Sequence, residues 1–259
     1  MLRPRIIPCL LASRKGLVKT VRFADPKYVG DPINAVKIFN EKEVDELIVL
    51  DIDATTGGTE PDYGMIRNLA AECRMPLCYG GGIKSLDQAV RIIKTGVEKV
   101  ALSSAAIEDP SLVARIATHV GSQSVVVVLD VRRARATGAY EVWTHNGRRN
   151  TGRHPASVAK EMEALGAGEI TVNSIDADGV MKGYDLELVR SVRGATSVPM
   201  TVLGGAGTLD DIAGLVREFG IIGAAAGSLF VFKGSYRAVL INYPARLKKW
   251  EITGMVPRA

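Results

Sequence analysis

A pattern of residues occurs twice along the chain, with a spacing of 123 or 124 positions between the two copies. Ile52-Asp53-Ala54 returns as Ile175-Asp176-Ala177, and Gly80-Gly81 returns as Gly204-Gly205. Repeats that stack into solenoids have periods of roughly 20–50 residues, so a spacing this long indicates two copies of a larger unit. The repeat therefore predicts one fold made of two similar halves.

Short apolar, β-branched runs alternate with amphipathic segments throughout the chain. Strands that are each followed by a helix indicate parallel pairing, because a parallel connection has to cross back over the sheet. Eight such units favour one domain over residues 1–259, a (β/α)8 TIM barrel built from two similar half barrels, with a doubly wound sheet as the alternative. The expected strands are Arg5–Leu11, Glu46–Asp51, Pro76–Tyr79, Lys99–Leu102, Ser124–Asp130, Glu169–Asn173, Met200–Leu203 and Ile222–Ala225. The expected helices begin near Pro32, Asp62, Ser85, Pro110, Pro155, Asp185, Thr208 and Ser235, with the aspartates before Pro32 and Pro110 as caps.

The composition is that of an ordinary globular protein, with 47% hydrophobic and 24% charged residues. The run Ile221 to Phe232 is too short and too rich in Gly and Ala to span a bilayer, and the start of the chain does not resemble a signal peptide. Three cysteines without metal or disulfide spacing predict a reduced, cytoplasmic chain. Six clustered arginines suggest contacts with an anionic ligand or partner in preference to nucleic acid: Arg132, Arg133, Arg135, Arg148, Arg149 and Arg153.

Two glycine-rich loops occupy equivalent positions in the two halves. Glycine lets bare backbone N–H groups approach a ligand, and a helix that begins just after the loop directs its N-terminus at the same place. Both loops therefore predict phosphate binding, and together they suggest a small-molecule ligand with a phosphate at each end. The expected phosphate-binding residues are Gly81, Gly82 and Ser104 in the first half and Gly204, Gly205, Gly227 and Ser228 in the second.

Asp130 ends the strand Ser124–Asp130 and is predicted to lie over the mouth of the barrel, where barrel enzymes place their chemistry. The repeat places Leu11 at the equivalent position of the first strand. Two carboxylates at these positions could act as general acid and general base, but a leucine cannot transfer a proton. Asp130 is thus the principal catalytic candidate, with Lys19 and Asp176 as further candidates.

Other polar side chains are expected near the same mouth. Asp51 and Asn173 are predicted to line the substrate pocket together with Leu11. Lys19 falls in the long first loop, Ala12 to Asp31, from which it could close on a phosphate. The segment Val131 to Arg153 is a second long loop, in which Tyr140–Thr144 predicts a hairpin arm. No metal site and no cofactor are expected, because the carboxylates lack His or Cys neighbours.

Charged residues of alternating sign begin four of the expected strands: Arg5, Glu46, Lys99 and Glu169. They could be solvated residues at the rim. If they point inward, they would form a ring that closes the bottom of the barrel, stable only when paired.

The chain resembles the cyclase subunit of imidazole glycerol phosphate synthase over essentially its whole length. The resemblance implies a glutaminase subunit docked on the amino-terminal face, with the four-charge ring gating ammonia into the barrel. It also implies a bisphosphorylated ribonucleotide at the opposite face, where ammonia is used to close an imidazole ring. The matching motifs are Arg5–Leu10, Gly30–Pro32, Asp45–Leu47, Gly80–Ile83, Asp109–Leu112, Gly121–Gln123, Ser174–Gly179 and Gly183–Asp185.

The chain departs from this family at positions close to the expected chemistry. Leu11 replaces one aspartate of the catalytic pair, Leu203 replaces a serine, Asn173 replaces a threonine, and Asp53 is also unusual. The pattern resembles paralogues associated with acetamidino modification of bacterial surface sugars, in which the barrel and its glutaminase supply ammonia to a separate amidotransferase. The alternatives are a true cyclase with a rearranged base and a catalytically silent scaffold that binds a phosphosugar.

Overall fold

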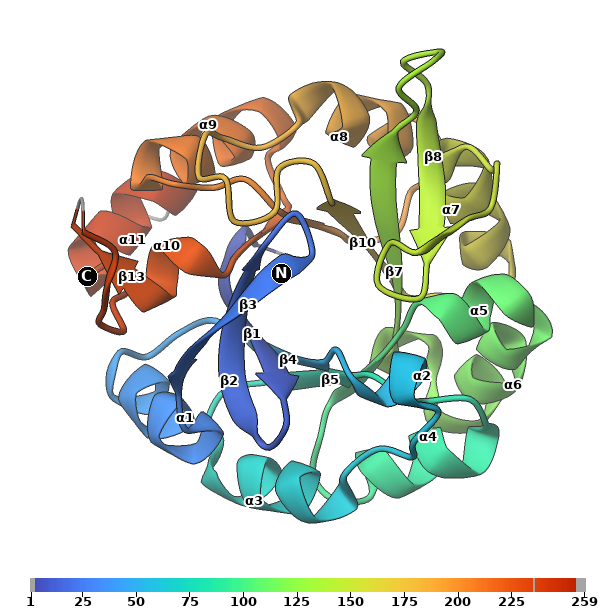
Figure 1. The fold of residues 1–259 in the computed structure, drawn as a ribbon, viewed down its shortest axis with the longest axis horizontal. Helices are drawn as coiled ribbons and strands as arrows, with labels where there is room; N and C mark the ends of the chain where they lie inside the picture. Colours follow the sequence, from blue (N-terminus) through green and yellow to red (C-terminus); the bar gives the residue numbers. More distant parts are fainter. Residues whose placement is uncertain (1–2, 235, 255–259) are drawn as a thin grey trace.

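A closed barrel of eight parallel strands lies at the centre of the chain, with helices around it (Figure 1). The computed structural model describes residues 3–234 and 236–254. Strand β10 pairs with both β7 and β11, and β12 pairs with β1, so the sheet closes on itself. The predicted (β/α)8 barrel is confirmed. Its strands are β1 Arg5–Ser13, β4 Leu47–Asp51, β5 Leu77–Gly80, β6 Lys99–Leu102, β7 Val125–Arg133, β10 Glu169–Ser174, β11 Met200–Leu203 and β12 Gly223–Ala226.

The helices begin where local capping favours them. Pro32 takes the first position of α1 and Asp31 caps it by accepting the Asn34 amide, while Thr208 and Asp211 form a capping box on α9. The longer helices are α1 Pro32–Glu41, α3 Tyr63–Glu72, α4 Leu86–Ile93, α6 Ser111–Val120, α7 Pro155–Ala164, α8 Leu186–Arg193, α9 Leu209–Phe219 and α11 Arg246–Thr253. Short turns of helix are α2 Ala54–Gly57, α5 Ser104–Glu108 and α10 Ser228–Val231, with the 3-10 turn η1 at Ser122–Ser124.

The apolar residues form two separate layers of core. The outer layer fills the space between strands and helices and includes Ile6, Phe39 and Tyr79. The inner layer fills the barrel itself, and its members are Ile7, Cys9, Ile48, Cys78, Ala101, Val126, Val128, Leu203 and Ala225, with Leu11 and Leu50 packed against it. Because the strands alternate between these layers, each one places every second side chain inside the barrel.

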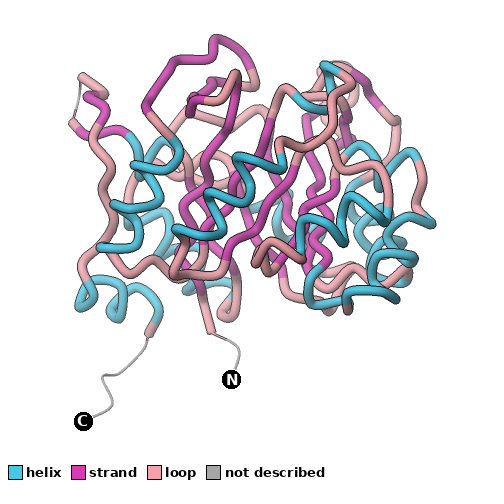
Figure 2. The backbone as a smooth tube through the Cα atoms, turned by 90° about the horizontal axis from the view of Figure 1, so that it is seen from below, coloured by secondary structure: helices cyan, strands magenta, loops and turns pink. Residues whose placement is uncertain are grey.

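Each half barrel opens with an antiparallel hairpin on its first strand. β2 (Gly16–Val21) pairs with β1, and β8 (Tyr140–Thr144) pairs with β7; both arms project from the carboxyl end of the barrel (Figures 1 and 2). The equivalent aspartates bind equivalent amides: Asp53 Oδ2 accepts from Arg14 N at 3.1 Å and Asp176 Oδ2 accepts from Arg133 N at 2.9 Å. The half-barrel repeat thus extends to individual hydrogen bonds. A two-residue strand, β9 (Arg149–Asn150), completes the second arm.

Two local predictions were wrong, and a third concerns a residue outside the described part. The expected first loop is the hairpin β2 and β3 (Ala24–Gly30). Pro110, expected at the first helical position, is the residue before α6, and the Asp109 carboxylate accepts the Ser111 hydroxyl. The helix expected near Ser235 falls on a residue outside the described part; around it, β13 (Phe232–Lys233) pairs with β14 (Ala238–Val239), and α11 begins only at Arg246.

The residues that the structure describes include no helix long and apolar enough to cross a membrane.

Candidate active site

A deep pocket opens at the carboxyl ends of the strands, as expected for a barrel enzyme. It encloses about 1210 Å³ of empty space, counting its open mouth. Residues from both half barrels line it, and every glycine and serine that the sequence predicted for phosphate binding is among them: Gly81, Gly82, Ser104, Gly204, Gly205, Gly227 and Ser228. The structure therefore brings the two predicted phosphate loops to one cavity.

The first glycine loop needs residues without side chains. Gly81 and Gly82 have φ angles of 115° and 73°, which L-residues rarely adopt. A Cβ on Gly81 would lie 2.3 Å from the backbone oxygen of Asp51. Next to this loop, the Ser104 hydroxyl accepts the amide of His145 at 2.9 Å and keeps its own proton for donation.

The second glycine loop is packed as tightly as the first. Gly204 and Gly205 have φ angles of 91° and 110°, and a Cβ on Gly205 would lie 2.1 Å from the backbone oxygen of Gly183. Gly227 approaches Lys19 so closely that a Cβ there would lie 2.5 Å from its ammonium nitrogen. These glycines and one basic side chain thus line the same pocket, which suits an anion.

Asp130 lies inside the mouth, where it is held by two neighbours. Asn173 Nδ2 donates to its Oδ1 at 2.8 Å and the Ser103 hydroxyl donates to its Oδ2 at 3.2 Å. Burial raises the pKa of Asp130 to about 6, although the hydrogen bonds from Asn173 and Ser103 oppose that rise. A carboxyl group with this pKa can exchange a proton near neutral pH.

Three leucines contribute an apolar part of the pocket wall. Leu11 and Leu50 pack against the inner core, to which Leu203 belongs. All three line the same pocket as Asp130, and Leu11 cannot transfer a proton to or from it. Asn173 is buried, and its amide oxygen has no hydrogen-bond partner among the described residues.

Lys19 reaches the pocket by a different route from the one predicted. It belongs to strand β2 and is buried, and its Nζ donates to the backbone oxygen of Cys9 at 2.5 Å. Burial lowers its pKa, against the opposing effects of Cys9 and Asp178. Lys19 thus lies in a hairpin strand that pairs with β1 and β3, and not in an irregular loop as expected.

The aspartates at the end of β4 and after β10 mainly order loops. Asp51 Oδ1 accepts the amides of Asp53 and Ala54 at 2.9 and 3.0 Å, and Asp51 also lines the pocket, as predicted. Asp176 was a catalytic candidate, but it is exposed and lies outside the pocket lining. Its carboxylate accepts the hydrogen bond from the backbone amide of Arg133 described above.

Asp178, two residues further on, takes the place expected for Asp176. It lines the pocket, and its Oδ2 accepts the Thr20 hydroxyl at 2.7 Å and the Phe23 amide at 3.2 Å, which fastens the β2–β3 hairpin over the mouth. Phe23 and Asn146 line the pocket too, and no sequence pattern indicated either of them. The alternation Asp-Ala-Asp does indicate that one aspartate faces inward, but not which one.

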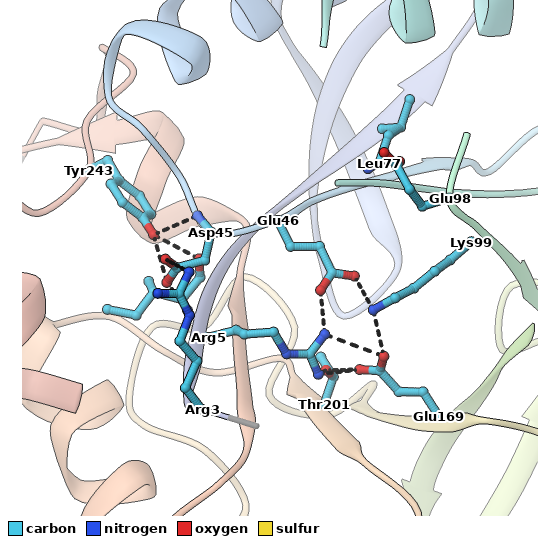
Figure 3. A network of polar contacts seen from close by, with 11 residues as sticks. Arg3, Arg5, Asp45, Glu46, Leu77, Glu98, Lys99, Glu169, Thr201 and Tyr243 are labelled. Carbon is cyan, nitrogen blue, oxygen red and sulfur yellow. Dashed lines mark hydrogen bonds and ion pairs between the residues drawn. The ribbon is translucent and has the colours of Figure 1, made fainter. Parts of the chain in front are cut away.

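The four charges at the strand starts point into the barrel and pair with one another, as Figure 3 shows. Arg5 contacts Glu46 and lies 2.7 Å from Glu169, while Lys99 lies 2.8 Å from each glutamate. Arg5 and Lys99 lower the pKa of Glu169 to about 2, although burial alone would raise it. These residues form a closed ring at the amino ends of the strands, and the solvated-rim alternative is wrong.

Comparison with known proteins identifies the family. The model of the family "Histidine biosynthesis protein" matches residues 5–237. A relative from Leptospira borgpetersenii is 59% identical over 94% of this chain and 96% of its own length, and one named hisF2 from Pseudomonas aeruginosa is 53% identical over 94% and 97%. Both are provisionally named as subunits of imidazole glycerol phosphate synthase.

A relative from Hyphomonas neptunium is named imidazole glycerol phosphate synthase subunit HisF without that reserve; it is 41% identical over 90% of this chain and 91% of its own length. The matches cover nearly the whole barrel, including both glycine loops and the charged ring. The chain therefore belongs to the histidine biosynthesis protein family and is a HisF-like barrel.

Proposed function

We propose that this chain is the barrel subunit of a glutamine-dependent amidotransferase system, taking ammonia from a glutaminase bound at the amino ends of the strands. The observation that carries the proposal is the arrangement of the two ends. A closed ring of two buried carboxylates and two partly buried cations lies at one end, and a pocket with two glycine loops lies at the other. A barrel that only bound a ligand at its mouth would gain nothing from four charges inside its base, because burying ions is costly.

The inner core supports passage of a small neutral molecule between these ends. Above the ring it consists of aliphatic side chains and the thiols of Cys9 and Cys78. Such a lining cannot solvate an ion, whereas neutral ammonia loses much less on leaving water. Passage through the barrel interior would keep the ammonia away from water until it arrives beside Asp130.

The two phosphate loops support an anionic small-molecule ligand in the pocket. They come from opposite half barrels and line one cavity. One phosphate on each loop would stretch the ligand across the mouth and place its middle over Asp130 and Asn173, where ammonia would emerge.

We infer that the chain supplies ammonia for amidination of a surface-polysaccharide sugar by a separate amidotransferase, and does not close an imidazole ring itself. Leu11 supports this inference, because proton transfer by two carboxylates is impossible with a leucine at one position. Four relatives at 53–59% identity are all provisionally named as subunits, whereas two relatives named HisF without that reserve are 41% and 38% identical.

The alternative is a true cyclase of histidine biosynthesis. One observation favours it: Asp130 has a pKa near 6 and shares the pocket with Lys19 and Asp178, so acid–base groups are present. Turnover of the family's bisphosphorylated ribonucleotide, with ammonia supplied directly, separates the two proposals. A silent phosphosugar-binding scaffold would show neither turnover nor ammonia transfer.

The main test follows the nitrogen atom. The barrel is mixed with a glutaminase and a sugar amidotransferase from the same organism, glutamine labelled with 15N in its amide, and excess unlabelled ammonium. Passage through the barrel predicts that the product sugar carries mostly 15N. A product that carries mostly unlabelled nitrogen would mean that ammonia is released to solvent, and the proposal would fail. The matched control replaces Lys99 by methionine, which breaks the ring without touching the pocket.

A further inference from the structure

Glu169 is bound more completely than the other carboxylate of the ring. It accepts from Arg5 Nη2 at 2.7 Å, from Lys99 Nζ at 2.8 Å and from the Thr201 hydroxyl at 2.5 Å (Figure 3). Glu46 accepts from Arg5 and Lys99 only, within the described residues. The ring therefore has a strongly held side and a more weakly held side.

Thr201 owes its position to the absence of a side chain on the next strand. Gly223 of β12 is the register partner of both Arg5 on β1 and Thr201 on β11. A Cβ on Gly223 would lie 2.0 Å from the Thr201 hydroxyl oxygen. Because β12 contributes no side chain at this level, Arg5 and the fully buried Thr201 can meet at Glu169 across it.

We propose that Thr201 is a positioning residue of the ring: its hydroxyl anchors Glu169 beside Arg5 and so helps to keep the ring closed. The inference rests on the proposed role of the ring as an ammonia entrance. No sequence signal pointed to Thr201, since a threonine inside a buried strand is ordinary. Its contacts with Glu169 and Arg5 give it this role.

The value of this anchor follows from the contacts that hold each carboxylate. Freeing Glu46 breaks two ion pairs, whereas freeing Glu169 breaks two ion pairs and the hydrogen bond from the fully buried Thr201. A hydrogen bond to a charged group is the stronger kind, so loss of the Thr201 hydroxyl would loosen Glu169, which both cations contact.

Cys78 offers a way to observe the opening. It is buried in the inner core and is the register partner of Lys99, so it lies directly above the ring. Replacing Cys9 by alanine and Cys73 by serine leaves Cys78 as the only thiol. Its rate of reaction with a small neutral reagent, methyl methanethiosulfonate, then reports how often the interior becomes accessible, and Lys99→Met in the same background gives the rate for a broken ring.

In this background Thr201→Val should raise the Cys78 reaction rate roughly tenfold or more, since a hydrogen bond to a charged group is lost. Thr201→Ala should do the same, whereas Thr201→Ser keeps the hydroxyl and should stay within about twofold of the parent. A Thr201→Val rate equal to the parent rate, or a Thr201→Ser rate as high as that of Thr201→Val, would overturn the proposal.

The measurement uses the barrel alone, without glutaminase. Failure of ammonia transfer in the complete system would therefore leave it unaffected. Urea unfolding of each variant is measured in parallel, and rescue by serine separates the effect of the hydroxyl from that of packing.

Discussion

Replacing Glu169 by glutamine should destabilise the folded barrel by about 3 kcal/mol near pH 7. In the folded protein the pKa of this carboxyl group is about 2, compared with an ordinary value of 4.5. A depressed pKa means that the ionised form is bound more favourably in the folded state, at roughly 1.4 kcal/mol for each pKa unit. Loss of one partner from a buried ion pair typically costs about 3–5 kcal/mol, which agrees with this value.

The same pKa fixes how the effect depends on pH. A group whose folded pKa is lowered contributes its full stabilisation above its unfolded pKa and loses it as the pH falls through the folded pKa. The difference in unfolding free energy between wild type and Glu169→Gln should therefore be largest above about pH 5 and fall to roughly half near pH 3.

Urea unfolding followed by circular dichroism at several pH values measures this difference. The matched control is Glu218→Gln, which removes a carboxylate from the exposed pair with Arg190 and should cost less than about 1 kcal/mol. If Glu169→Gln costs no more than this control, or if its cost does not change between pH 7 and pH 3, the ring is a solvated rim and the reasoning is wrong.

Three further predictions concern the pocket. Leu11→Asp should raise cyclase turnover with free ammonia by about 100-fold or more, and wild-type turnover at the rate of an ordinary cyclase would contradict this. Gly205→Ala should abolish sulfate binding at the second loop in crystals, because its Cβ would lie 2.1 Å from a backbone oxygen; Gly214→Ala, with open space around it, should leave binding intact. Asp178→Ala should accelerate hydrogen exchange of the Phe23 amide about tenfold, and an unchanged rate would show that the hairpin is held by other contacts.

The barrel could be predicted from the sequence because its signals are local and repeated. Each strand carries its own apolar run, and caps such as Asp31 and Thr208 mark helix starts independently of the rest of the fold. The two glycine loops were also predictable, since a backbone that needs positive φ at Gly81 and Gly205 leaves a visible mark in the sequence.

The remaining features depend on contacts that no local pattern encodes. The hairpin that carries Lys19 exists because β2 finds an unpaired edge at the end of β1, and Asp178 then fastens its turn from the other half barrel. Whether Asp176 or Asp178 faces the pocket depends on how that turn is docked. Thr201 acquires its role only because Gly223 leaves room beside it.

Strand β1 is the first strand made and the last one to be completed. Its edge toward β4 can pair early, but its other edge pairs with β12, so that Arg5 meets Gly223 only when nearly all of the chain is available. Contacts between residues so distant in sequence form slowly, because the loop between them has to be closed first. During synthesis Arg5 can therefore bind Glu46 through one guanidinium nitrogen well before Glu169 and Thr201, which the other nitrogen contacts, have been made. The charged ring is complete only when the barrel has closed. The residues proposed to admit ammonia are therefore assembled only in the fully folded chain.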